Sequence, residues 1–192
     1  MNLSNRLESM QFSTIRKLAP YAEEAKKRGV SVYHLNIGQP DIHTPSTFME
    51  GINNFKDKVL RYENSQGMDQ LIESFIKYYL EWNIELSKSE ILVTNGGSEA
   101  ILFAFMAICD PGDEIIIPEP FYTNYNGLAD LASVKVVPFI TKAEEGFHLP
   151  SKEEITSRIT KKTRAIMVSN PGNPTGVVYT QAEIRMLADI VK

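Results

Sequence analysis

Asn170-Pro171-Gly172-Asn173-Pro174-Thr175-Gly176 is the stretch that decides the fold of this chain. Proline locks φ and has no N–H, whereas glycine reaches backbone angles that other residues rarely adopt, so this composition favours one loop conformation. The preceding run, Arg164-Ala165-Ile166-Met167-Val168, is short, apolar and branched, which is typical of a buried strand of an α/β sheet. The loop therefore leaves the carboxyl end of a strand, where open α/β sheets bind ligands, and it holds the Asn173 amide there.

Outside this loop, the sequence alternates short apolar strands with helices. Strands are predicted at Val32–Asn36, Ile91–Val93, Glu114–Ile117, Val134–Phe139 and Arg164–Val168. Helices are predicted at residues 14–28 (with a kink at Pro20 and a stop at Gly29), Asp69–Trp82, Ser98–Cys109, Tyr122–Leu131, Lys152–Arg158 and Gln181–Val191. This order predicts an α/β fold with a mainly parallel sheet and helices on both faces.

A second glycine-rich loop, Thr94-Asn95-Gly96-Gly97-Ser98, joins a predicted strand to an apolar helix. The glycines permit a sharp turn, Ser98 is a candidate helix cap, and the free N–H groups of a helix N-terminus attract anions. The run from Gly96 to Ala100 also comes near the Gly-x-Ser-x-Gly nucleophile elbow of hydrolases. Its last position is alanine and only His148 follows as a possible base, which disfavours a hydrolase.

The Asn170–Gly176 loop resembles the Asn-Pro-x-Asn-Pro-Thr-Gly signature of class I/II aminotransferases. These are the aspartate-aminotransferase-like enzymes of fold type I that depend on pyridoxal 5'-phosphate (PLP). Four further stretches match in order, so the resemblance extends from about Ile15 onward: Leu35–Asp41, Arg61–Gly67, Thr94–Ser98 and Pro118–Tyr125. One departure is Leu71-Ile72, where many members carry Leu-Arg.

The resemblance implies a role for each matching residue. Gly97 and Ser98 would hold the cofactor phosphate, Tyr122 would stack on the pyridine ring, and Asn173 would bind the phenolic oxygen of the ring next to the substrate. The Gly38 backbone would lie against the substrate carboxylate. The Tyr62 hydroxyl would reach the phosphate of the partner subunit in a homodimer.

The resemblance also implies an incomplete set of catalytic groups. In the family, the Schiff-base lysine, the carboxylate that binds the pyridine nitrogen and the arginine that binds the substrate all follow the Asn-Pro loop. They are therefore expected beyond Lys192, since Lys88 and Lys152 lack the family's context. We expect residues 1–45 to form an N-terminal arm and part of the small domain, and residues 46–192 to form the first part of the PLP-binding large domain. The chain is then the front half of a longer protein.

Composition narrows the remaining classes of function. Net charge is −4 with a pI near 5.5, which argues against a nucleic-acid partner. The longest apolar run, Ala100–Cys109, is too short to span a bilayer, and the N-terminus lacks a signal peptide, so a cytoplasmic location without membrane association is expected. The three histidines and one cysteine show no metal-ligand spacing, so no metal site is expected.

These observations favour a PLP-dependent aminotransferase that moves an amino group between an amino acid and a 2-oxo acid. Two alternatives stay open. The first is another fold type I PLP enzyme, such as a carbon–sulfur lyase, which would share these motifs. The second is a catalytically silent fragment, a binding or scaffolding module at most. The sequence does not indicate which amino acid is the substrate, because the arginines that set specificity would lie elsewhere.

Overall fold

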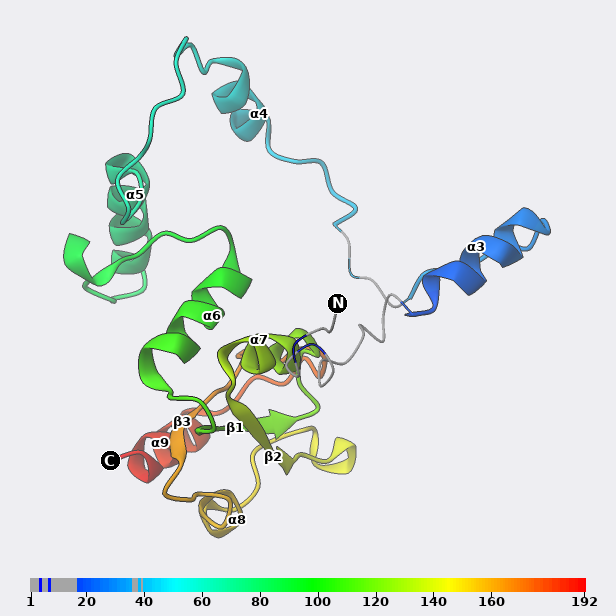
Figure 1. The fold of residues 1–192 in the computed structure, drawn as a ribbon, viewed down its shortest axis with the longest axis vertical. Coiled ribbons are helices and arrows are strands. Elements are labelled where there is room, and N and C mark those ends of the chain that lie inside the picture. The colour runs from blue at the N-terminus through cyan, green and yellow to red at the C-terminus, as the bar shows by residue number, and fades with distance from the viewer. Residues whose placement is uncertain (1–3, 5–6, 8–16, 36–37, 39) are drawn as a thin grey trace. The chain divides into compact units, whose positions relative to one another are not determined.

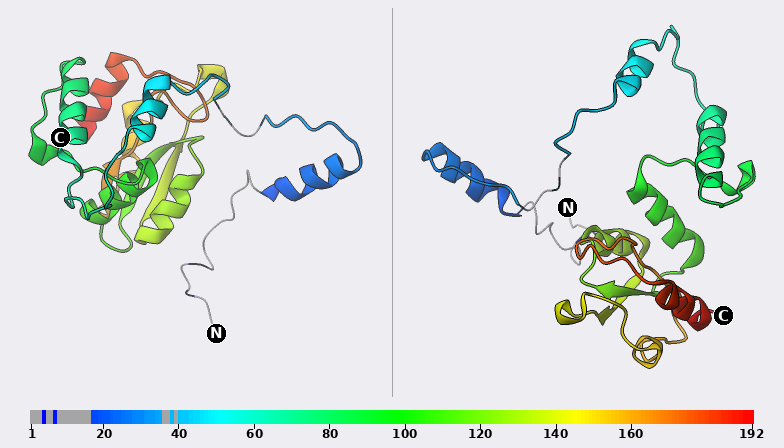
Figure 2. Two further views of the ribbon diagram at one scale, coloured as in Figure 1. Left: turned by 90° about the horizontal axis from the view of Figure 1, so that it is seen from above. Right: turned by 180° about the vertical axis from the view of Figure 1, so that it is seen from behind.

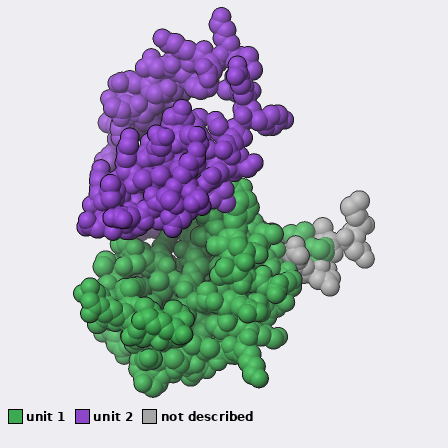
Figure 3. Space-filling model, turned by 90° about the vertical axis from the view of Figure 1, so that its left-hand side faces the viewer, with its two compact units in different colours: residues 1–17, 96–192 green, residues 18–95 purple. Residues whose placement is uncertain are grey.

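The computed structural model describes residues 4, 7, 17–35, 38 and 40–192 (Figure 1). The chain forms two compact units, which Figure 3 shows in different colours. One consists of residues 96–192 together with 1–17, and the other of residues 18–95. The domain boundary predicted between residues 45 and 46 stays a prediction.

The first unit is built on a three-stranded parallel sheet. Its strands are β1 (Glu114–Glu119), β2 (Lys135–Ile140) and β3 (Thr163–Ile166), in the order β2-β1-β3. Ile115, Ile116 and Ile117 of the central strand are at most 2% exposed. A continuous branched apolar run suits a strand that is covered on both faces, because successive side chains point to opposite sides.

Helices cover both faces of this sheet (Figures 1 and 2). They are α6 (Gly97–Ile108), α7 (Asn124–Ala132), α8 (Lys152–Thr156) and α9 (Gln181–Ile190), with the short η2 (Ala143–Glu145). Ile115 packs with Phe105 of α6 and with α7, whereas Ile116 packs with Ile155 of α8 and Leu187 of α9. The predicted α/β fold with helices on both faces of a parallel sheet is confirmed.

Charged side chains tie the strands together at their amino ends. Arg164 Nε donates to Asp113 Oδ2 at 2.7 Å, and Glu114 accepts from Thr160 Oγ1 at 2.6 Å and from Lys135 Nζ at 3.3 Å. The hydrogen bond from Arg164 lowers the pKa of Asp113, and that from Thr160 lowers the pKa of Glu114. These ionic contacts occupy the amino edge of the sheet, so the loops at the opposite, carboxyl edge are the candidates for a ligand site.

The second unit contains the helices α3 (Ala19–Lys27), α4 (Ser46–Asn53) and α5 (Asp69–Leu80), and the short η1 (Lys88–Glu90). Gly29 ends α3 as predicted: its φ is +81°, and the N–H of Val30 donates to the C=O of Ala25 at 3.1 Å. Pro20 lies in the first turn of α3, a position that suits proline, and the kink predicted there stays a prediction because it depends on residues outside the description. Residues 14–16 of the predicted helix lie outside the described residues.

Two predicted strands of the second unit are wrong within its described residues. Residues 32–35 and 91–93 belong to no strand, and Asn36 lies outside the description. Segment 91–93 pairs with a loop instead, since Val93 N–H donates to Gln66 C=O at 2.9 Å. Glycine is required at position 67 for two reasons. Its φ is +117°, and a Cβ there would lie only 2.5 Å from Val93 Cγ2.

Candidate functional site

The loop after β3 is closed by its own backbone. Gly172 N–H donates to Val177 C=O, and Gly176 N–H donates to Gly172 C=O, both at 2.8 Å. A Cβ on Gly172 would lie 2.6 Å from Thr175 Oγ1 and 2.9 Å from Val177 Cγ1, and Gly176 has a φ of +73°. Both glycines are therefore required, one by close packing and one by backbone conformation. The peptide bonds before Pro171 and Pro174 are cis.

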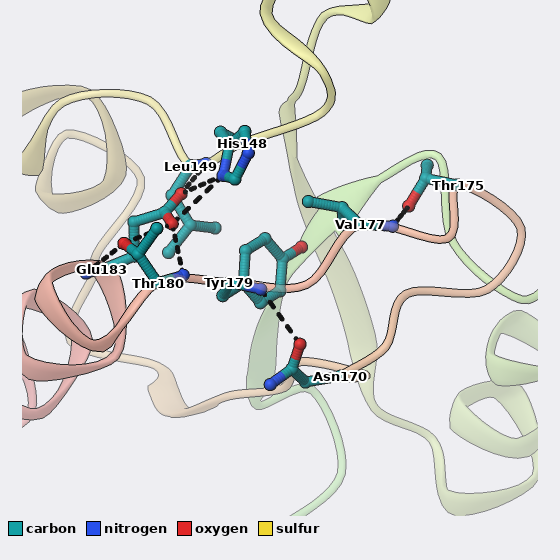
Figure 4. A network of polar contacts seen from close by, with 8 residues as sticks. All are labelled: His148, Leu149, Asn170, Thr175, Val177, Tyr179, Thr180 and Glu183. Atoms are coloured by element: carbon teal, nitrogen blue, oxygen red, sulfur yellow. Dashed lines mark hydrogen bonds and ion pairs between the residues drawn. The ribbon is translucent and has the colours of Figure 1, made fainter.

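The two asparagines of this loop have different surroundings. Asn170 is used internally, because its Oδ1 accepts the N–H of Tyr179 at 3.0 Å and so joins the start of the loop to its end (Figure 4). Asn173 is exposed, and no residue in the described part of the chain makes a hydrogen bond to its side chain. The Asn173 side chain is thus available to a ligand through both its oxygen and its nitrogen, whereas the Asn170 oxygen is engaged.

A shallow, solvent-open pocket lies where this loop meets the carboxyl end of β1. Its walls are aromatic or apolar on the β1 side and largely polar on the loop side. The β1 side consists of Ile117, Pro118, Pro120, Phe121 and Tyr125, and the loop side of Ser169, Gly172, Asn173, Thr175 and Tyr179. The structure thus brings Asn173 together with the segment that contains Tyr122.

Tyr122 stands beside the pocket, and its neighbours line it. The rings of Phe121 and Tyr125 are stacked with centroids 6.3 Å apart, and Tyr122 meets Tyr125 edge-on at 5.4 Å. The Tyr122 hydroxyl accepts a hydrogen bond from Asn124 Nδ2 at 2.6 Å. The aromatic cluster, defined here as Phe121, Tyr122 and Tyr125, therefore forms one side of the site.

Gly97 and Ser98 form the first turn of α6. Both are exposed, and no described residue accepts a hydrogen bond from their N–H groups. Ser98 does not cap the helix as predicted, because the N-cap is Gly96, with a φ of +86°. α6 precedes β1 in the chain, and its Phe105 packs with Ile115 of that strand. Gly97 and Ser98 are not among the residues that line the pocket.

Gly38 and Tyr62 belong to the second unit. Both are exposed there, and a Cβ on Gly38 would meet no described atom within 4 Å. Their predicted roles toward the substrate and the partner subunit stay predictions.

Glu183 connects the end of the pocket loop to a second loop (Figure 4). Its carboxylate accepts the N–H and O–H of Thr180, both at 2.7 Å, the N–H of Leu149 at 2.8 Å, and a contact from His148 Nδ1 at 3.1 Å. In return, Thr180 Oγ1 caps α9 by accepting the N–H of Glu183 at 3.3 Å. This capping box was not predicted, although the Thr-x-x-Glu spacing of Thr180 and Glu183 indicates it.

Burial of Glu183 acts to raise its pKa, but the hydrogen bonds from Thr180, Leu149 and His148 outweigh burial and bring the pKa from 4.5 to about 2. The group is therefore a carboxylate at neutral pH. His148 Nδ1 must then carry the hydrogen in their contact, since a carboxylate only accepts.

Glu183→Gln is expected to lower the free energy of unfolding by about 1–3 kcal/mol at pH 7, because donors of Thr180 and Leu149 lose a charged acceptor. A carboxylate whose pKa is depressed on folding stabilises the protein above its unfolded pKa, and this contribution is lost as pH falls toward the folded pKa. The difference in the free energy of unfolding between wild type and Glu183→Gln, measured with urea, should therefore become smaller as the pH falls from 5 to 3.

The matched control is Glu154→Gln, which removes the same charge from the same N3 position of α8, next to the cap Ser151. Glu154 is exposed and accepts no such set of hydrogen bonds through its carboxylate in the described part of the chain. Glu154→Gln should therefore leave the free energy of unfolding nearly unchanged. An equal loss in both variants, or a gap for Glu183→Gln that does not change with pH, would contradict the assigned network.

Within the described ranges, no group of three or more His, Cys, Asp or Glu side chains is placed to hold a metal ion. No helix in those ranges is long and apolar enough to cross a membrane.

Residues 30–192 match the family model described as aminotransferase class I and II. This match covers more than half of the sequence, and the chain therefore belongs to the class I and II aminotransferases, a PLP-dependent family.

Relatives of known name agree with this assignment. The chain is 35% identical over 98% of its length to a probable aspartate/prephenate aminotransferase of Thermus aquaticus, and 33% identical over 99% to an aspartate aminotransferase of Bacillus subtilis. It covers 49% of each. Among solved structures, an alanine aminotransferase from Pyrococcus furiosus is similar with a TM-score of 0.92 and 32% identity, over 99% of this chain and 49% of that one. The chain thus spans about half the length of the relatives it matches.

Proposed function

We propose that this chain supplies much of the cofactor-binding site of a PLP-dependent aminotransferase. Such an enzyme moves an amino group between an amino acid and a 2-oxo acid. The observation that carries the proposal is Asn173, whose unpaired, exposed amide lines a pocket at the carboxyl edge of a parallel sheet. Family membership supports the reaction class.

The residues of the described site fit PLP, which has a flat aromatic ring, a phenolic oxygen and a phosphate. The aromatic cluster offers ring faces and edges on one side of the pocket, and Asn173 offers an amide on the other. Gly97 and Ser98 offer free N–H groups at a helix N-terminus, which suits a phosphate.

When bound, PLP serves as an electron sink for chemistry at the α-carbon of an amino acid. The Asn173 amide would donate to the phenolic oxygen and hold the ring in one orientation, while Tyr122 and its cluster would restrict access of water to the ring face. The N–H groups of Gly97 and Ser98 would bind the phosphate. The Gly38 backbone would make room for the substrate carboxylate, and Tyr62 would serve the site of a partner subunit in a homodimer.

The test is amino-group transfer by the protein expressed from its complete open reading frame. With PLP, one amino acid and one 2-oxo acid, an aminotransferase should convert both substrates in equal amounts and should stop when the oxo acid is left out. Release of a thiol from a sulfur amino acid without any oxo acid would indicate a carbon–sulfur lyase instead. No conversion of any amino acid or oxo acid in a broad panel would contradict the proposal and favour a silent fragment.

A further inference from the structure

Tyr179 brings to the pocket a hydroxyl group that the described part of the protein does not use. The residue is only 7% exposed and lines the pocket, yet no described residue makes a hydrogen bond to its phenolic oxygen. Every completely sealed side-chain nitrogen or oxygen among the described residues does have a partner. The Tyr179 hydroxyl is therefore not completely sealed, and Tyr179 is one of the residues that line the pocket.

The position of Tyr179 is fixed from both sides. Its N–H is held by Asn170 Oδ1 at 3.0 Å, and the next residue, Thr180, is held by the Glu183 carboxylate through two hydrogen bonds of 2.7 Å (Figure 4). Neither contact involves the phenol. The network thus fixes the backbone that carries the ring and leaves the hydroxyl free, which is the arrangement of a preorganised binding group.

The environment keeps the hydroxyl in its donor form. Burial raises the pKa of Tyr179, and the nearby Glu183 charge raises it further, so the phenol stays protonated at neutral pH. Where the hydroxyl reaches open space, water can pair with it. An oxygen acceptor that enters the pocket would replace that water.

We propose that the Tyr179 hydroxyl is a further hydrogen-bond donor of this site and that it binds an acceptor oxygen of the ligand in the pocket. The inference rests on the proposed function, because it takes the ligand to be PLP or the 2-oxo acid substrate of the proposed aminotransferase. PLP and a 2-oxo acid both carry oxygen atoms that accept hydrogen bonds, so the experiment must distinguish the two ligands.

Tyr179→Phe separates these cases, since it removes one oxygen and keeps the ring. We expect the melting temperature of the ligand-free protein to stay the same or rise. The dissociation constant should increase about fivefold or more for the ligand that the hydroxyl contacts. Fluorescence titration with PLP and, in the PLP-loaded protein, spectral titration with 2-oxoglutarate measure the two affinities. An affinity change confined to the PLP titration identifies the cofactor as the ligand that the hydroxyl contacts, and one confined to the 2-oxoglutarate titration identifies the substrate.

Tyr78→Phe is the control, because it makes the same change on an exposed ring of α5. It should alter neither affinity.

Wild-type affinities for both ligands in Tyr179→Phe would overturn the inference and leave the proposed function intact. A lower melting temperature of the ligand-free variant would also overturn it, because the hydroxyl would then have a structural partner. If the wild-type protein bound neither PLP nor 2-oxoglutarate, the proposed function and this inference would both be wrong.

Discussion

Asn173→Ala is expected to lower the turnover of the complete protein by about 10- to 150-fold, because one hydrogen bond to a charged group contributes about 1.5–3 kcal/mol. Affinity for PLP should fall less, since the phosphate contacts of Gly97 and Ser98 would remain. Folding stability should not change, because no described residue makes a hydrogen bond to the Asn173 side chain. Turnover, PLP affinity and urea unfolding, measured on the same preparation, check these three expectations.

Asn170→Ala is the matched control, three residues earlier in the same loop. It should lower the free energy of unfolding by about 1–3 kcal/mol, because the buried N–H of Tyr179 loses its acceptor. If Asn173→Ala destabilised the protein as much as Asn170→Ala did, or left turnover unchanged, the assignment of Asn173 to the cofactor would be wrong.

The second large effect concerns covalent attachment. No lysine of residues 1–192 is expected to be fixed to PLP by borohydride reduction, because the residues that line the pocket include no lysine in the described part of the chain. Lys88 pairs with Asp69 at 2.7 Å in the second unit, and Lys152 is an exposed residue at the start of α8. Peptide mapping after reduction measures the labelling of each lysine.

Low, scattered labelling at several exposed lysines is the expected result for this chain. Stoichiometric labelling of a single lysine within residues 1–192 would contradict the expectation. It would mean that this chain carries its own covalent anchor for the cofactor.

The sheet and its covering helices were predictable because local signals agreed with the packing. The branched run at Ile115–Ile117 indicated a strand covered on both faces, and the structure buries it between two helical layers. Gly29 indicated the end of a helix through its need for positive φ. The short helix Ser46–Asn53 was not predicted, since it has no side-chain cap to mark its start.

The errors arose where the partner of a segment decides its structure. Ile91–Val93 has the composition of a strand, but a strand requires a neighbouring strand, and the segment pairs with the Gln66 loop instead. Ser98 was predicted to cap its helix because serine favours that position, but Gly96 adopts the positive φ at which α6 begins.

Within the site, the sequence predicted which loops would matter but not which atoms would be free. The spacing of Asn170 and Asn173 gave no indication that the oxygen of the first amide accepts the Tyr179 N–H, while no described residue makes a hydrogen bond to the second amide. Tyr179 itself was overlooked because a lone tyrosine after a turn is ordinary in sequence. Only the structure marks Tyr179 as a candidate binding residue, because it is buried and its hydroxyl has no partner among the described residues.

The proposed PLP-binding site is tested most directly by NMR, by following the backbone amide signals of the ¹⁵N-labelled protein during titration with PLP. If these residues bind PLP, saturable shifts are expected in three segments: Gly97 and Ser98, residues 121–125, and residues 172–179. Inorganic phosphate should shift only the first of these. Shifts that avoid the loop around Asn173, or spectra that do not change at millimolar PLP, would show that this chain does not bind the cofactor in the proposed way.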